Sequence, residues 1–87
     1  MSAVHAADIA NSTYQLGAGD VISIRVFGED ELSFDEVRLN DAGTFSYPFL
    51  GDLQARNKTA AQIEELIIGG LKGEYLIDPK VSVRILE

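Results

Sequence analysis

Apolar and polar residues alternate along several short stretches of the chain, which is the pattern of strands with one buried face. In the first stretch, Ile22, Ile24 and Val26 alternate with Ser23 and Arg25. Because the apolar side chains of such a strand all point to one side, each stretch needs a covering layer on that side. The alternation predicts strands over residues 21–27, 35–39, 44–47, 52–54 and 81–85.

The second and third of these stretches are predicted to pair as a hairpin. The connecting residues 40–43, Asn-Asp-Ala-Gly, have turn chemistry, since Asn and Asp side chains bond to nearby backbone and Gly accepts a positive φ. Pro48 follows the return strand and cannot donate to a sheet ladder, so we expect it at an edge, a bulge or a strand end. Gly51 then lets the chain turn into the next short strand.

The apolar spacing becomes helical after Thr59. Thr59 with Gln62 three residues later is a capping box, which indicates the start of a helix. Gly73 is placed to end that helix in a left-handed conformation. The pair Gly69-Gly70 falls inside the pattern, where it either allows close approach to the sheet or loosens the last turns. The residues predicted to face the core are Ala60, Ile63, Leu66, Ile67 and Leu71.

Together these elements predict a small α+β fold: a mixed β-sheet of about five short strands with one amphipathic helix packed on one face. The 87 residues are enough for one domain, and their 46% hydrophobic content favours a packed core. We assign residues 14–87 to this domain. Residues 1–13 are predicted to be a disordered tail or the trimmed leader of an exported protein, because Val4-His5-Ala6 resembles the end of a secretory signal.

The charge of the chain disfavours two classes of partner. Fourteen acidic residues stand against seven basic ones, which gives a formal net charge of −7. Nucleic acids and anionic membrane surfaces recruit clusters of Lys and Arg, and the sequence has no such cluster. No stretch approaches the roughly 18 apolar residues of a membrane span. We therefore expect no nucleic-acid partner, and membrane association only through parts absent from this chain.

Little in the sequence points to catalysis. The single histidine, His5, lies in the tail and the chain has no cysteine, which disfavours a nucleophile beside a base and a metal site. The consecutive acids of residues 29–31 are typical of a solvated loop. Residues 17–20, Gly-Ala-Gly-Asp, precede a strand and open no helix, so they indicate a turn, not a phosphate loop. We expect no enzyme activity, no cofactor and no metal.

Four motifs in order resemble the polysaccharide export domain of outer-membrane exporters of the Wza type. "YQLGAGD" opens the domain, "VFGEDEL" ends the first strand, "DAGTFSYPFLG" forms an aromatic ribbon and "YLIDPKVSV" closes it. Each motif is weak alone, but their order and spacing cover nearly the whole chain. The motif positions to which we assign a structural role are Tyr14, Gly17, Gly19, Asp20, Gly28, Asp78 and Pro79.

The resemblance implies a non-catalytic periplasmic domain, the N-terminal module of a larger exporter. Copies of it would form a ring in an outer-membrane channel that passes capsular polysaccharide or exopolysaccharide. The implied location is the periplasmic side of the bacterial outer membrane. The implied partners are the polysaccharide, bound weakly and transiently, other copies of the protein, and an inner-membrane polysaccharide co-polymerase. The residues implied at the interface or channel mouth are Tyr47, Pro48, Phe49, Leu50 and Gly51.

The aromatic residues leave a second function open. Phe45, Tyr47 and Phe49 are equally well explained as core residues or as surface residues, since aromatic side chains are enriched at interfaces. If two or three aromatic rings were exposed and coplanar, the chain could instead be a soluble carbohydrate- or peptidoglycan-binding module.

Overall fold

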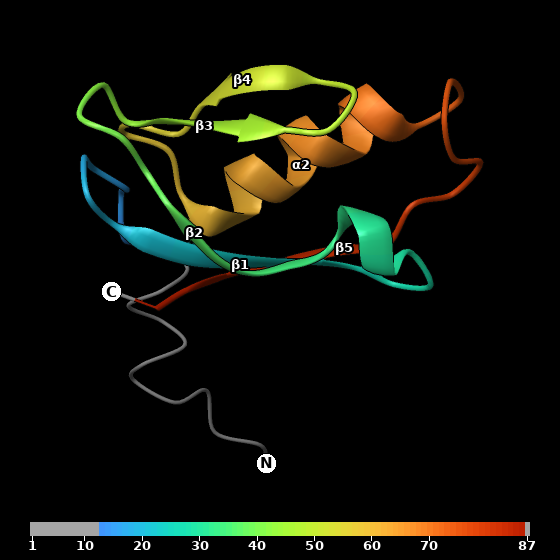
Figure 1. Cartoon of the computed structure of the whole chain (residues 1–87), viewed down its shortest axis with the longest axis horizontal. Coiled ribbons are helices and arrows are strands. Elements are labelled where there is room, and N and C mark those ends of the chain that lie inside the picture. Colours follow the sequence, from blue (N-terminus) through green and yellow to red (C-terminus); the bar gives the residue numbers. More distant parts are fainter. Residues whose placement is uncertain (1–12, 87) are drawn as a thin grey trace, which may run out of the picture.

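The computed structural model describes residues 13–86, and the predicted leader lies outside these residues except for Thr13. The described part is a small α+β fold, which confirms the predicted class (Figure 1). Its elements in chain order are β1 (Val21–Val26), the 3-10 turn η1 (Asp30–Leu32), β2 (Phe34–Arg38), β3 (Thr44–Tyr47), β4 (Gly51–Gln54), α2 (Ala60–Leu71) and β5 (Val81–Ile85).

The strands form two antiparallel sheets, so the prediction of one mixed sheet was wrong. β1 is the central strand of a three-stranded sheet, with β2 and β5 at its edges, whereas β3 and β4 form a separate two-stranded ribbon. Figure 1 shows α2 lying between the two sheets. The apolar faces of both sheets are therefore covered by the same helix.

The predicted hairpin between β2 and β3 is also wrong, although its turn is confirmed. Asn40 accepts the N–H of Thr44 with its side-chain oxygen at 2.9 Å, and Gly43 has a φ of 77°. The carbonyl of Gly43, however, accepts the N–H groups of Ala55 and Arg56 at 2.8 and 3.0 Å. These bonds tie the turn to the end of β4, so β3 pairs with β4 while β2 pairs with β1.

Both ends of helix α2 agree with the prediction. The Thr59 hydroxyl accepts the N–H of Gln62 at 3.3 Å, and the Gln62 side chain accepts the N–H of Thr59 at 2.9 Å, which completes the capping box. Gly73, just beyond the helix, has a φ of 84°. A glycine is favoured there because this conformation is strained for other residues.

The buried stripe of α2 is narrower than predicted. Ile63, Ile67 and Leu71 are fully buried, and steps of four residues place them in one row along the helix. Leu66 was predicted to face the core, but it lies on the flank of that row and is 37% exposed. The helix therefore contacts the two sheets mainly through this single row and Ala60.

Gly70 makes room for a side chain of the ribbon. A Cβ atom added at Gly70 would lie 2.6 Å from Cδ2 of Leu50, whereas a Cβ atom added at Gly69 would have no neighbour within 4 Å. Of the two possibilities considered for the glycine pair, close approach therefore holds at Gly70, and the partner is Leu50.

Replacing Ile67 by Asp is expected to unfold the domain, because an unpaired carboxylate would replace a fully buried side chain. Leu66→Asp on the same helix should fold and lose no more than about 1 kcal/mol. Urea titration followed by far-UV circular dichroism compares the two variants. Equal destabilisation would contradict the orientation of the helix described above.

The two adjacent glycines provide a second matched pair. Gly69→Ala should raise the free energy of unfolding by up to about 1 kcal/mol, because alanine favours the helix and its Cβ meets open space. Gly70→Ala should gain less or lose stability, because Leu50 must move. Equal gains in urea titrations would show that Leu50 does not need the space.

Candidate functional site

The opening motif forms a compact hydrogen-bonded turn in front of β1. One carboxylate oxygen of Asp20, Oδ2, accepts the N–H of Gly17 at 2.8 Å and the hydroxyl of Tyr14 at 2.9 Å. The hydrogen bond to Asp20, a small desolvation and the nearby negative charge raise the pKa of Tyr14. Gly19, between them, has a φ of 81°. The spacing of Tyr14, Gly17 and Asp20 in this motif is therefore the one that the hydrogen-bonded turn requires.

The other predicted motif residues lie where β1 ends and β5 begins. Gly28 has a φ of 80°, which lets the chain turn away after β1. Pro79 is buried, and the exposed Asp78 pairs with Lys80 at 3.3 Å. The Lys80 carbonyl accepts the N–H of Phe27 at 3.0 Å, so this motif joins the two strand ends.

Tyr47, one of the residues implied at the interface or channel mouth, does not present its side chain at the surface of the domain. It is only 3% exposed, and Phe45 beside it on the ribbon is buried as well. The Tyr47 ring packs edge-on against Phe34, with ring centroids 5.8 Å apart. Its hydroxyl donates to the carbonyl of Leu32 at 2.7 Å, and burial raises its pKa to about 12.

The turn after Tyr47 holds Phe49 in an unusual conformation. The N–H of Leu50 donates to the carbonyl of Tyr47 at 3.2 Å, and Pro48 and Phe49 are the central residues of the turn. Phe49 has a φ of 69°. A positive φ after a proline is the arrangement of a type II turn, which strongly favours glycine at that place. Yet the Phe49 side chain is 65% exposed.

Phe49 stacks on an aromatic ring from a distant part of the sequence. Its partner is Tyr75, in the segment after α2, with ring centroids 4.5 Å apart and ring planes inclined by 20°. Tyr75 is 43% exposed. We call this exposed pair the aromatic platform. Of the other residues predicted at the interface, Pro48 and Leu50 are half-buried and Gly51 is exposed.

The aromatic platform is one wall of a shallow groove of about 320 Å³. Figure 1 shows why such a groove can form: η1, the turn between β3 and β4, and the segment after α2 lie at the same end of the molecule. The residues that line it are Glu29, Glu31, Leu32, Pro48, Phe49, Tyr75 and Leu76.

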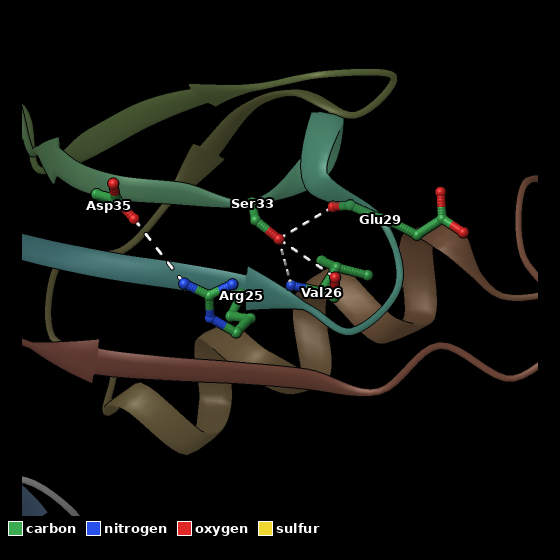
Figure 2. A network of polar contacts seen from close by, with 5 residues as sticks. All are labelled: Arg25, Val26, Glu29, Ser33 and Asp35. Carbon is green, nitrogen blue, oxygen red and sulfur yellow. Dashed lines mark hydrogen bonds and ion pairs between the residues drawn. The ribbon is translucent and has the colours of Figure 1, made fainter.

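The acidic wall of the groove is held in place by Ser33. The Ser33 hydroxyl oxygen accepts the N–H of Val26 at 2.9 Å, and it lies 3.0 Å from the Glu29 carbonyl, to which it can donate. Figure 2 shows that the Glu29 carboxylate points away from this network. The backbone of Glu29 is therefore fixed while its carboxylate stays available.

A second surface lies on the outer face of the three-stranded sheet. Arg25 on β1 is paired with Ser82 on β5, and Ser23 is paired with Arg84, so the two arginines stand diagonally on neighbouring strands. They line a groove of about 310 Å³. The Asp35 carboxylate contacts Arg25 at 3.9 Å and is almost fully exposed (Figure 2). The groove thus has two arginines against one aspartate, a small positive excess in a chain with a net charge of −7.

The main features of the first groove were not predicted from the sequence. The acids of residues 29–31 have the pattern of an ordinary solvated loop, and Phe49 and Tyr75 lie far apart in the chain. The signal that could have located Phe49 is a bulky residue directly after Pro48 in a turn, at the position where glycine is favoured. No sequence signal specified Tyr75 as its partner.

Two negative findings apply to the described part of the chain. Within residues 13–86, no group of three or more acidic, histidine or cysteine residues is placed to hold a metal ion. None of the helices described has the length and apolar character needed to cross a membrane.

Comparison with known proteins gives the family. The family model described as polysaccharide biosynthesis/export protein matches residues 8–86. The chain belongs to this family. This confirms the resemblance to the polysaccharide export domain found in the sequence motifs.

A curated relative in this polysaccharide export family is the capsule polysaccharide export outer membrane protein CtrA of Neisseria meningitidis serogroup A / serotype 4A (strain DSM 15465 / Z2491). It is 31% identical over 94 residues, a similarity that covers 87% of this chain and 24% of the relative. The chain thus spans about a quarter of the length of that relative.

Tyr47→Phe is expected to lower the free energy of unfolding at pH 7 by about 1 kcal/mol, since the Leu32 carbonyl loses its donor. The raised pKa of Tyr47 also makes the free energy of unfolding depend on pH. The folded state keeps the phenol proton above pH 10, where an unfolded tyrosine loses it, so this part of the stability is complete below pH 10 and declines towards pH 12.

Urea titrations between pH 8 and pH 11.5 test this, with Tyr75→Phe as the control for loss of an exposed phenol. The decline of stability with rising pH should be shallower in Tyr47→Phe than in the wild type. An unchanged decline would show that Tyr47 is not its source.

Proposed function

We propose that this chain is a non-catalytic domain of a larger polysaccharide exporter, acting on the periplasmic side of the bacterial outer membrane. The observation that carries the proposal is the family match over nearly the whole chain. The relative's name adds capsular polysaccharide and the outer membrane, and its length, about four times that of the similar region, supports a domain within a larger protein. Because no nucleophile–base pair is visible in the sequence, we assign the domain no reaction of its own.

Self-assembly into a ring is the second part of the proposal. A ring requires each copy to use two different surfaces, one for each neighbour. The outer face of the three-stranded sheet, with Arg25 and Arg84, is our candidate for one of them. A neighbouring copy has a net charge of −7, so it has acidic residues in excess that can pair with this groove.

The turn of residues 47–51 is assigned to the mouth of the channel. Phe49 and Gly51 are exposed there, and the half-buried Pro48 and Leu50 support them. Tyr47 contributes from the core by fixing the start of the turn. An inner-membrane co-polymerase remains a proposed partner on the strength of the family resemblance, and we assign it no surface.

A soluble carbohydrate- or peptidoglycan-binding module is the second candidate. One observation favours it: Phe49 and Tyr75 are both exposed and adjacent, although their rings are stacked face to face and not side by side in one plane. The two candidates differ in the effect of the domain on export.

In the bacterium that carries the gene, removal of the codons for residues 14–86 should abolish surface polysaccharide and leave polymer inside the cell envelope. Immunoblots of surface and envelope fractions measure both pools. Normal surface polysaccharide in the deletion strain would contradict the exporter function and favour the binding module.

Ring assembly has its own test in the detergent-solubilised protein. The double reversal Arg25→Glu with Arg84→Glu should shift the oligomer to smaller species in analytical ultracentrifugation, because acidic faces would then oppose each other. Arg56→Glu with Lys72→Glu makes the same change of charge away from the sheet face and should leave the oligomer intact. Equal effects of both pairs would refute the assignment of this face.

A further inference from the structure

The conformation of Phe49 is not explained by the needs of the core. Its φ of 69° is unfavourable for a residue with a Cβ, by about 1–2 kcal/mol. Burial of the ring offsets little of this conformational free energy, because 65% of the residue is exposed. Asn57 has a similar φ of 67°, but asparagine tolerates that conformation well. Strain of this kind concentrates at functional sites.

What the strained turn achieves is the placement of one ring against another. Phe49 and Tyr75 are nearly parallel at 4.5 Å, and both line the 320 Å³ groove. Each ring keeps a face that the other does not cover. The apolar side chains of Leu32, Pro48 and Leu76 continue this surface. The groove is therefore lined by the stacked aromatic pair and by these three apolar side chains.

The charged residues that line the groove are all negative. Glu29 and Glu31 supply carboxylates, and the lining residues include no lysine or arginine. Carboxylates accept hydrogen bonds from hydroxyl and ammonium groups and repel other carboxylates. Glutamate is depleted in the centre of protein–protein interfaces, so this combination fits a small polyhydroxylated ligand better than an apolar protein surface.

We propose that Phe49 and Tyr75 form a stacking site for one neutral or amino-bearing pyranose unit of a glycan. The apolar C–H face of the sugar ring lies on the face of the Phe49 ring that Tyr75 leaves uncovered, and its hydroxyl or ammonium groups donate to Glu29 and Glu31. The volume of about 320 Å³ is at the small end of ligand pockets and suits one sugar ring. The glycan as ligand class rests on the proposed function, whereas the site and its charge preference rest on the groove.

The affinity of such a site is expected to be weak. A sugar ring has about a dozen non-hydrogen atoms, and at ordinary ligand efficiency such a ligand binds with a Kd of about 1 mM. One weak site per domain holds a passing chain briefly and lets it go.

The test is an NMR titration of the ¹⁵N-labelled 87-residue chain with three tetrasaccharides: neutral N-acetylglucosamine, amino-bearing glucosamine and acidic galacturonic acid. The first two should saturate with millimolar Kd and shift signals around residues 29–31, 48–50 and 74–76. The acidic one should bind at least tenfold more weakly. No shifts up to about 50 mM of the neutral sugar, or equal affinity for all three, would overturn the proposal.

Matched variants locate the site. Phe49→Gly relieves the backbone and removes the ring, and should weaken binding of the neutral sugar at least tenfold. Phe27→Ala removes another exposed aromatic ring, which does not line the groove, and should bind as the wild type does. Glu29→Gln with Glu31→Gln should narrow the difference between neutral and acidic sugars. Wild-type binding by Phe49→Gly would overturn the proposal.

Two further outcomes are informative. Shifts of the same residues on simple concentration of the protein, without response to sugar, would mean that a second copy occupies the platform and would overturn the sugar site. Absence of sugar binding together with loss of export in the deletion strain would remove this proposal alone and leave the exporter function standing.

Discussion

The hydrogen bond donated by the Tyr47 hydroxyl is the interaction on which the groove depends. A buried phenol requires a partner, and this one reaches the carbonyl of Leu32 at 2.7 Å. The ribbon and the three-stranded sheet share no strand pairing, so this bond and the contact with Phe34 connect them directly. Residues 29–32 form one wall of the groove, and the turn that follows Tyr47 forms the other. The hydrogen bond between Tyr47 and Leu32 in the core therefore fixes the distance between the two walls.

The exposure of Phe49 follows from its neighbours. Tyr47 points into the core, and Leu50 occupies the space that Gly70 leaves open. With Tyr47 and Leu50 held inward and joined by the hydrogen bond of the turn, the two residues between them must project outward. Pro48 fixes the backbone φ of the first of these two positions, and Phe49 adopts a positive φ at the second. The aromatic platform is therefore built by a rigid turn and not by a flexible loop, which suits a binding site.

The features that could be predicted from the sequence are those decided within a few residues. The capping box of Thr59, the turn at Asn40 and Gly43, and the helix of α2 each depend on local hydrogen bonds or local spacing. The burial of Phe45 and Tyr47 also agrees with their alternation with Thr44 and Ser46, although the sequence alone left their role open. The family resemblance rested on such short motifs in order.

The features that could not be predicted depend on contacts between distant segments. The carbonyl of Gly43 directs β3 to β4, and nothing near residue 43 specifies Ala55 as its partner. Leu66 has the right spacing for the core, but the two sheets leave room for only one row of α2. Similarly, the carboxylate of Glu64 on α2 accepts the N–H of Val83 on β5 at 2.9 Å, and no nearby residue specifies that partner. The pairing of Phe49 with Tyr75 belongs to the same class.

The central claim is that Phe49 is held in an unfavourable conformation for the sake of its exposed ring. Urea denaturation of the wild type and of Phe49→Gly tests it most directly, with Asn57→Gly as the control for glycine at another positive φ. Phe49→Gly should be as stable as the wild type or more stable, by up to about 1 kcal/mol, because glycine relieves the backbone strain. A loss of more than about 1 kcal/mol would show that the ring supports the fold and would contradict the account.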